Sequence, residues 1–164
     1  MKTKLSIALF LLLFCVSSAV HAQSTRKATG FMETKWGMGE SELTALYPGN
    51  QLSKRKNKWG DLVYEKDYSI LTEKSFSAQF MMDESGGLKQ IQFLRPAKTF
   101  EKDTCEDLFI LLKKQYDYIG SRNMEDGEAA YVIESFASAD SKIKLVTISW
   151  KTGAFSIAVL YQPK

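Results

Sequence analysis

The feature that most constrains the fold is an alternation within residues 75–82, where apolar residues at the even positions are separated by Ser75, Ser77 and Gln79. Side chains in a strand point alternately to opposite faces, so a period of two predicts a strand with one buried face. Residues 83–87 have the composition of a tight turn, and residues 88–94 return as the partner strand. The chain therefore contains an antiparallel hairpin whose apolar face requires a cover. In the first strand that face is formed by Phe76, Ala78, Phe80 and Met82.

A short helix within residues 36–49 is the first candidate cover. Gly39 can serve as its N-cap, and Glu42, three residues later, can accept a hydrogen bond from the free N–H of the cap. Met38 and Leu43 have the spacing of a hydrophobic staple, which fixes the direction in which the chain enters a helix. We therefore expect the folded domain to begin here.

A second, longer helix is predicted over residues 104–119, because apolar residues recur there at helical spacing. Asp103 or Thr104 is expected to cap its start, and Gly120 is expected to end it. Its apolar stripe is formed by Cys105, Leu108, Leu112, Tyr116 and Ile119.

The remaining apolar segments are read as strands joined by short turns, which pair antiparallel. They predict a two-layer α+β domain in the order αβββαβββ, with an antiparallel sheet of about six strands and two helices on one face. The repeated order suggests an internal duplication. Residues 50–60 and 121–128 are expected to be polar loops. The strands are expected at 62–71, 75–82, 88–94, 130–137, 143–150 and 155–161.

Residues 1–22 have the three zones of a secretory signal peptide, with a basic start, an apolar run and small residues before a cleavage site. The apolar run is too short to span a bilayer comfortably, which favours cleavage over an uncleaved membrane anchor. We therefore expect a periplasmic or secreted bacterial protein without a transmembrane segment in the mature chain. A flexible segment at 23–30 and a single α+β domain at 31–164 would remain.

Cleavage would remove the only histidine, His21, and one of the two cysteines, Cys15. No Ser-His-Asp triad, Cys-His pair or histidine zinc site could then form, and one thiol cannot make a Cys-x-x-Cys redox pair. Paired acidic residues occur in turns and a first helical turn, where solvation and capping explain them. We expect no catalytic residues, no metal and no cofactor. Cys105 is expected to be either a buried, inert thiol or part of an intermolecular disulfide.

Charge is concentrated in one stretch rather than spread over the chain. The formal charge is +3, and cleavage leaves 20 basic and 19 acidic side chains, so nucleic-acid binding finds no support. The basic stretch is either a solvated loop or a site that docks on anionic head groups or an acidic partner. Its residues are Lys54, Arg55, Lys56, Lys58 and Trp59.

The segment 143–150 is a second candidate binding feature, because it is apolar on both faces. Val146, Ile148 and Trp150 share the face opposite to Ile143. A sheet covered by helices on one side is expected to be polar on the other. Either loops cover this second face, or it presents an apolar patch that recognises a partner or a second copy of the chain.

The strands are preceded by a glycine, a short amphipathic helix and a Pro-Gly pair that ends it. The residues of this pattern are Gly37, Met38, Leu43, Leu46, Pro48 and Gly49. This arrangement resembles small bacterial periplasmic modules. Two such groups are the small lipoproteins of the outer-membrane β-barrel assembly machine and the β-lactamase inhibitor proteins, which repeat a helix-and-sheet unit. The resemblance implies a non-catalytic interaction module. The chain departs from the lipoprotein pattern, because Phe14 precedes Cys15 where lipidation requires a small residue.

Two classes of function follow. The first is a non-catalytic interaction module that binds a protein or an envelope component, or a second copy as a homodimer. The alternative is a small-ligand carrier with a pocket between helices and sheet, lined by Phe76, Phe80, Leu108 and Leu112. A hydrolase that uses carboxylates is the least favoured class, because the acids are scattered and histidine is missing.

Overall fold

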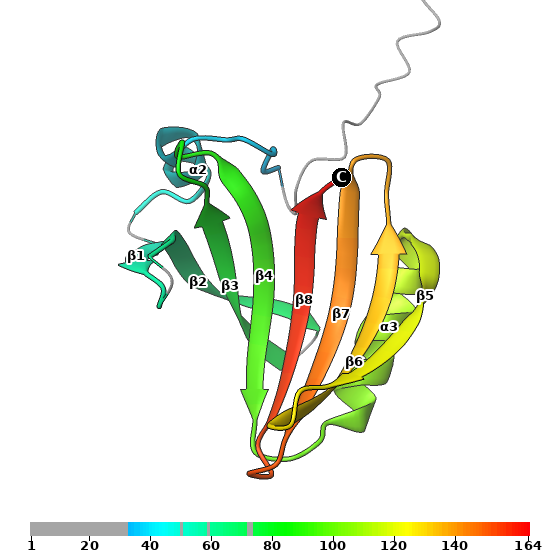
Figure 1. Cartoon of the computed structure of the whole chain (residues 1–164). Helices are drawn as coiled ribbons and strands as arrows, with labels where there is room; N and C mark the ends of the chain where they lie inside the picture. The colour runs from blue at the N-terminus through cyan, green and yellow to red at the C-terminus, as the bar shows by residue number, and fades with distance from the viewer. Residues whose placement is uncertain (1–32, 50, 59, 72–73) are drawn as a thin grey trace, which may run out of the picture.

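The protein folds around one twisted antiparallel sheet (Figure 1). The computed structural model describes residues 33–49, 51–58, 60–71 and 74–164. Within these ranges the helices are α2 (Glu40–Leu46) and α3 (Lys102–Gln115). The order of strands across the sheet is β1-β2-β3-β4-β8-β7-β6-β5. The strands are β1 (Ser53–Lys56), β2 (Leu62–Leu71), β3 (Lys74–Met82), β4 (Leu88–Ala97), β5 (Asp117–Glu125), β6 (Ala129–Ala137), β7 (Ser141–Trp150) and β8 (Phe155–Pro163).

The expectation of a two-layer α+β domain with about six strands is wrong. The described residues are mostly sheet, with eight antiparallel strands and two short helices in the order αββββαββββ. The two unexpected strands, β1 and β5, form the edges of the sheet. Every residue of β1 is exposed, and so is every residue of β5 except Gly120. An edge strand with water on both faces has no apolar alternation, and that alternation is the pattern from which strands are predicted.

The boundary between α3 and β5 also differs from the prediction of one helix over 104–119. Helix α3 ends at Gln115, and Tyr116 follows as a C-cap with extended backbone. Gly120 lies inside β5, at an irregularity of its pairing with β6. Its φ of +152° is a conformation that residues with a side chain rarely adopt. The glycine therefore permits a bulge in a strand rather than ending a helix.

A row of apolar side chains crosses the sheet on the face toward the helices. Helix α2 adds Leu43 to it, and helix α3 adds Leu108 and Leu112, all at most 2% exposed. Both helices and six neighbouring strands therefore share one core. From β2 to β6, the row consists of Tyr64, Phe80, Ile91, Tyr161, Ile143 and Phe136.

The four residues expected to line a ligand pocket belong to this core. Phe76 and Phe80 are each 1% exposed, and Leu108 and Leu112 are equally inaccessible. Close packing of such side chains leaves little room between them. The middle of the space between helices and sheet is therefore filled by the protein itself.

The start of α2 confirms the predicted capping. Gly39 is the N-cap, and its N–H donates to the Glu42 carboxylate at 3.0 Å. Met38 and Leu43, on either side of the cap, are both buried in the core, as a hydrophobic staple requires. The helix thus begins where the sequence pattern places it.

The segment that leads into α2 is held on the beginning of β4. The Gly37 N–H donates to the carbonyl of Leu88 at 2.9 Å, and the Leu88 N–H donates to the carbonyl of Met38 at 2.9 Å. A Cβ at Gly87 would lie only 3.2 Å from the Cα of Gly37. Glycine at this position therefore allows the two backbones to approach closely.

Helix α3 is anchored by an ion pair at its first turn rather than by the expected cap at Asp103 or Thr104. Glu101 is the N-cap residue, and its carboxylate receives Nε and Nη2 of Arg95 at 2.9 and 3.0 Å. The Thr104 hydroxyl donates to the same carboxylate at 2.9 Å. The hydrogen bond with Arg95 lowers the pKa of Glu101. These contacts join the end of β4 to the start of the helix.

Substituting Leu108→Ala tests whether α3 is integral to this core. Leu108 is 0% exposed, so the truncation removes buried apolar surface and leaves a cavity. We expect the variant to lose about 2–5 kcal/mol of its free energy of unfolding. Ile110→Ala on the same helix is the matched control, because Ile110 is 64% exposed and should change stability by roughly 0.5 kcal/mol or less. Urea unfolding measures the free energy of unfolding of both variants. Equal losses of stability would contradict the packing of Leu108 in the core.

Candidate functional site: the open sheet face

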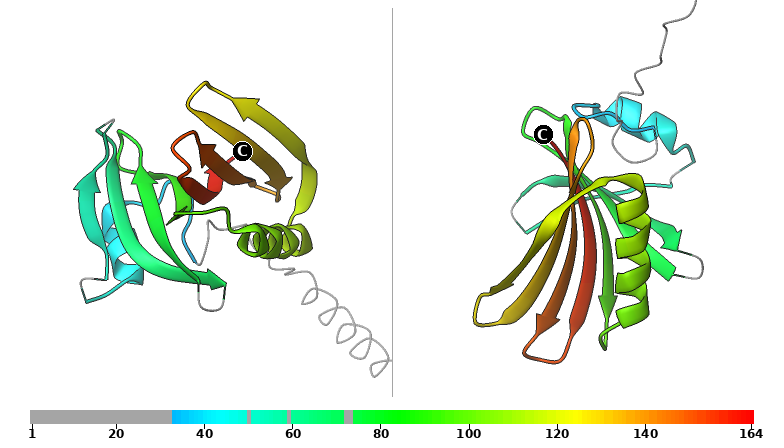
Figure 2. Two further views of the ribbon diagram at one scale, coloured as in Figure 1. Left: turned by 90° about the horizontal axis from the view of Figure 1, so that it is seen from below. Right: turned by 90° about the vertical axis from the view of Figure 1, so that its right-hand side faces the viewer.

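The sheet face turned away from the helices is left uncovered by both described helices. We call it the open face. Figure 2 shows α3 lying along the strands on the other face, and α2 packs into the same core. The register places one open-face residue of each strand from β2 to β6 in a central row. That row consists of Glu65, Gln79, Gln92, Leu160, Lys144 and Ser135.

Four glutamine side chains form an ordered ladder across this face. The amide of Gln162 donates to Gln90 at 2.8 Å, and the amide of Gln90 donates to Gln92 at 3.2 Å. Gln92 donates to Gln79 at 2.6 Å, and Gln79 donates to the Glu65 carboxylate at 3.0 Å. Each amide thus donates in the same direction, toward a charged acceptor. Hydrogen bonds connected in this way polarise one another and hold the amide groups in place.

The carboxylate of Glu65 is the acceptor at the end of the ladder. It also receives the Ser77 hydroxyl and Nε of Arg55, the latter at 2.7 Å. Desolvation raises the pKa of Glu65, but the hydrogen bonds from Ser77, Arg55 and Gln79 outweigh it and hold the pKa below its usual value. The carboxylate therefore stays ionised and keeps the ladder oriented.

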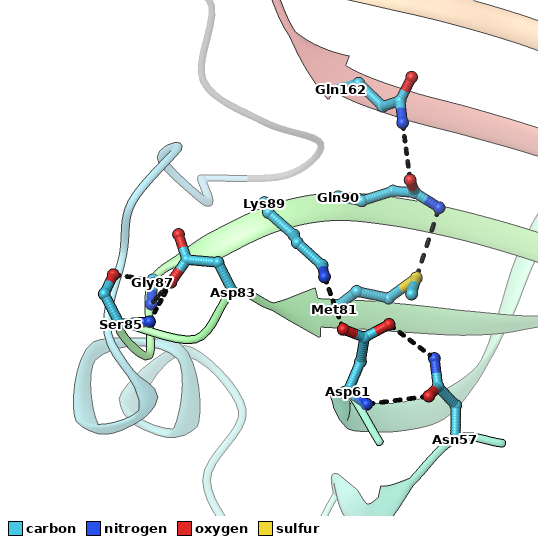
Figure 3. A network of polar contacts seen from close by, with 9 residues as sticks. All are labelled: Asn57, Asp61, Met81, Asp83, Ser85, Gly87, Lys89, Gln90 and Gln162. Atoms are coloured by element: carbon cyan, nitrogen blue, oxygen red, sulfur yellow. Dashed lines mark hydrogen bonds and ion pairs between the residues drawn. The ribbon is translucent and has the colours of Figure 1, made fainter. Parts of the chain in front are cut away.

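A second network fixes the edge of the open face (Figure 3). Nζ of Lys89 on β4 lies 2.7 Å from Oδ1 of Asp61, and the Asn57 amide donates to Oδ2 of Asp61 at 3.0 Å. The Asp61 N–H returns a hydrogen bond to the Asn57 side chain at 2.9 Å. These contacts tie the β1–β2 connection to β4, so the edge is held in place.

A groove of about 590 Å³ lies between this edge and the ladder. Arg55, Asn57 and Lys58 form its basic and polar rim. Its floor is mixed, with the thioether of Met81 accepting a hydrogen bond from the Gln90 amide at 3.4 Å (Figure 3). A surface with apolar groups between fixed donors and acceptors suits a protein segment more than a single ion.

The far half of the open face is more apolar. Val146 is 8% exposed and Ile148 is half-buried, whereas Trp150 is 39% exposed. Of the three residues predicted on this strand, Trp150 is therefore the one that presents a large apolar surface to solvent. Aromatic residues of this kind are enriched in the centres of protein interfaces.

Cations without an acidic partner lie within this apolar half. Lys142 and Lys144 project from β7, and Arg122 lies on β5 in register with Ile133 on β6. No ion pair joins any of the three to an acid in the described part of the chain. The open face therefore has a net positive charge in this half.

Part of the predicted basic loop, Ser53–Lys56, is the strand β1, and its cations point to different faces. Nζ of Lys54 lies 2.7 Å from Glu40 at the start of α2, whereas Arg55 is paired with Glu65 on the open face. Lys56 is exposed and Lys58 lines the groove. Trp59 lies outside the described residues.

The two predicted sets of binding residues are not brought together. Four strands lie between β1 and β7 in the sheet. Five spacings of about 4.8 Å therefore place the two sets roughly 24 Å apart. What lies between them is the glutamine ladder, which sequence reasoning missed. Its signal in the sequence was the presence of glutamines in strands, with Gln90 and Gln92 two positions apart on β4, Gln79 on β3 and Gln162 on β8.

No group of three or more His, Cys, Asp or Glu side chains that could hold a metal ion occurs among the residues that the structure describes. No described helix is both long and apolar enough to cross a membrane.

Comparisons of the chain with protein-family models, with curated proteins and with solved structures found no match.

Glu65→Gln tests the ladder through its pH dependence. Folding lowers the pKa of Glu65, so its ionisation stabilises the fold at any pH above the unfolded-state pKa of 4.5. This stabilisation disappears as the pH falls through the folded-state pKa. The difference in unfolding free energy between the wild type and Glu65→Gln should therefore shrink between pH 6 and pH 3, as measured by urea unfolding.

Glu84→Gln is the control for this series, because the exposed Glu84 makes no ion pair or hydrogen bond with other described residues. Its difference from the wild type should stay small throughout. A difference for Glu65→Gln that is constant from pH 6 to pH 3 would contradict the role assigned to this carboxylate.

Proposed function

We propose that this protein is a non-catalytic interaction module of the periplasm or extracellular space that binds another protein through the open face. The secretory features of residues 1–22 support the compartment. The observation that carries the proposal is the open face itself. It combines an ordered glutamine ladder with apolar residues and unpaired cations, and no described helix covers it.

The size of the face fits a protein partner. In sheet order, the six neighbouring strands are β2, β3, β4, β8, β7 and β6. Their five spacings of about 4.8 Å give a width of roughly 24 Å. A standard interface covers about 800 Å² per partner, which corresponds to a patch roughly 28 Å across. An ordered ladder also reduces the loss of side-chain freedom on binding, because its amides are already held.

The charge of the face selects an acidic partner. Lys142, Lys144 and Arg122 have no acid opposite them in the described chain, so carboxylates of a partner would complete these pairs. The same charges oppose a homodimer formed face to face, because each copy would present cations to cations. An acidic protein is therefore favoured over a second copy.

Site-directed photocrosslinking tests this proposal. The chain is prepared with p-benzoylphenylalanine at Ile148 or Met124 on the open face, or at Lys114 on α3 as a control. Each version is illuminated in an envelope extract of the producing cells, and adducts are identified by mass spectrometry. The open-face positions should yield the same acidic protein, and the Lys114 position should not.

The identified protein is then purified and its affinity measured by calorimetry. Replacing Lys142→Glu and Lys144→Glu together should weaken binding by about tenfold or more, and added salt should weaken the wild-type complex. Adducts from Lys114 alone, adducts between two copies of the chain, or an affinity unchanged by charge reversal would each overturn the proposal.

A further inference from the structure

A second hollow lies on the opposite side of the molecule from the open face, between α3 and the strands β6 and β7. Its volume is about 630 Å³. It is distinct from the filled core, because none of Phe76, Phe80, Leu108 and Leu112 lines it. Its apolar lining is formed by Phe100, Cys105, Phe109, Ile110, Val132 and Leu145.

The hollow exists because the side chains under α3 become smaller along the sheet. On β7 the helix-facing residues change from Ile143 and Leu145 to Thr147 and Ser149. The end of α3 near Leu112 is filled by the core, whereas its first turns lie above the smaller side chains. No described side chain is large enough there to fill the space, so a pocket remains.

The pocket is lined by apolar groups that water reaches. Phe100 is 61% exposed, Ile110 is 64% exposed and Val132 is 40% exposed. Phe100 is held in place by edge-to-face contact with Phe155, with ring centroids 4.9 Å apart. Exposed apolar side chains gathered around one hollow mark a binding site more often than scattered ones do.

The polar groups of the pocket restrict the charge of a ligand. The Glu134 carboxylate accepts hydrogen bonds from the hydroxyls of Tyr118 at 2.8 Å and Ser121 at 2.9 Å, and no cation pairs with it in the described chain. Glu106 lies at the rim, where its carboxylate pairs with Nζ of Lys102 at 3.5 Å. The unpaired carboxylate of Glu134 disfavours an anionic ligand and leaves an acceptor for a donor or an ammonium group.

The thiol in the pocket adds no negative charge. Burial, with the nearby carboxylates of Glu101 and Glu106, raises the pKa of Cys105 to about 11. Cys105 is a free, half-buried cysteine, so at neutral pH it is a protonated and weakly reactive part of the apolar wall.

We infer that this pocket binds a small apolar molecule that is uncharged or cationic. A volume of about 630 Å³ is typical of small-molecule sites, which are apolar with a few placed polar groups. The inference is independent of the proposed function, because the two sites lie on opposite faces of the sheet. The protein would thus present one face to a protein and the other to a small ligand.

Two fluorescent probes with the same apolar body test the inference. N-phenyl-1-naphthylamine is uncharged, whereas 8-anilinonaphthalene-1-sulfonate has the same rings and a sulfonate. Titrated into the protein purified from the envelope of the producing cells, the uncharged probe should bind with a dissociation constant on the order of 10 µM, and the sulfonate at least about tenfold more weakly. Equal or tighter binding of the sulfonate would overturn the inference.

Pocket variants locate the bound probe. Val132→Trp fills the hollow and should weaken binding of the uncharged probe by about tenfold or more, and Ile110→Ser, at a position already 64% exposed, should weaken it without endangering the fold. Met124→Trp is the matched control, because Met124 is 42% exposed and lies on the other face. Unchanged affinity in both pocket variants would contradict the site.

Glu106→Gln combined with Glu134→Gln tests the charge preference. The two probes should then bind with similar affinity, because the amides remove the repulsion of the sulfonate while preserving the shape of the pocket. Concentration-dependent self-association, followed by light scattering and abolished by Val132→Trp, would show that a second copy occupies the hollow. That result would also overturn the inference.

Discussion

The pairing of β4 with β8 is the interaction on which the rest of the structure depends. Seven residue pairs join these strands, from Ile91 opposite Tyr161 to Ala97 opposite Phe155. The strands come from separate halves of the chain, and each half is a helix followed by four strands. Without this seam each half would have an unpaired edge and an incomplete core. With it, the core row and the open face both continue across the whole sheet.

The two faces of that sheet differ because the strand period is two. On one face the side chains pack under two helices, but the shorter residues at the ends of β6 and β7 leave a hollow. On the other face the sheet presents the glutamine ladder, on β3, β4 and β8, and three cations, on β5 and β7. Gln162 donates to Gln90 across the seam, so the ladder depends on the pairing that builds the core. Stability and the proposed recognition therefore share one origin.

The sequence predicts the parts of the fold that bury apolar surface. The alternating hairpin, the capping of α2 by Gly39 and the core role of Leu108 all follow from periodicity and capping. The edge strands β1 and β5 do not, because exposed strands lack the alternation that reveals a strand. The sequence predicts the candidate sites even less well, because the ladder and the hollow are formed by strands that are distant in sequence. The sequence left open whether the face that contains Trp150 is covered; Trp150 is exposed, whereas Val146 on the same face is buried.

The most direct test of this account is an NMR measurement on the protein with ¹⁵N-labelled glutamine side chains. The amide protons of Gln162 should show cross-relaxation with the side chain of Gln90, 72 positions away, and should exchange slowly with water. That result would establish the seam and the ordered open face together. Averaged glutamine amide signals with no contact between these two side chains would contradict the central claim.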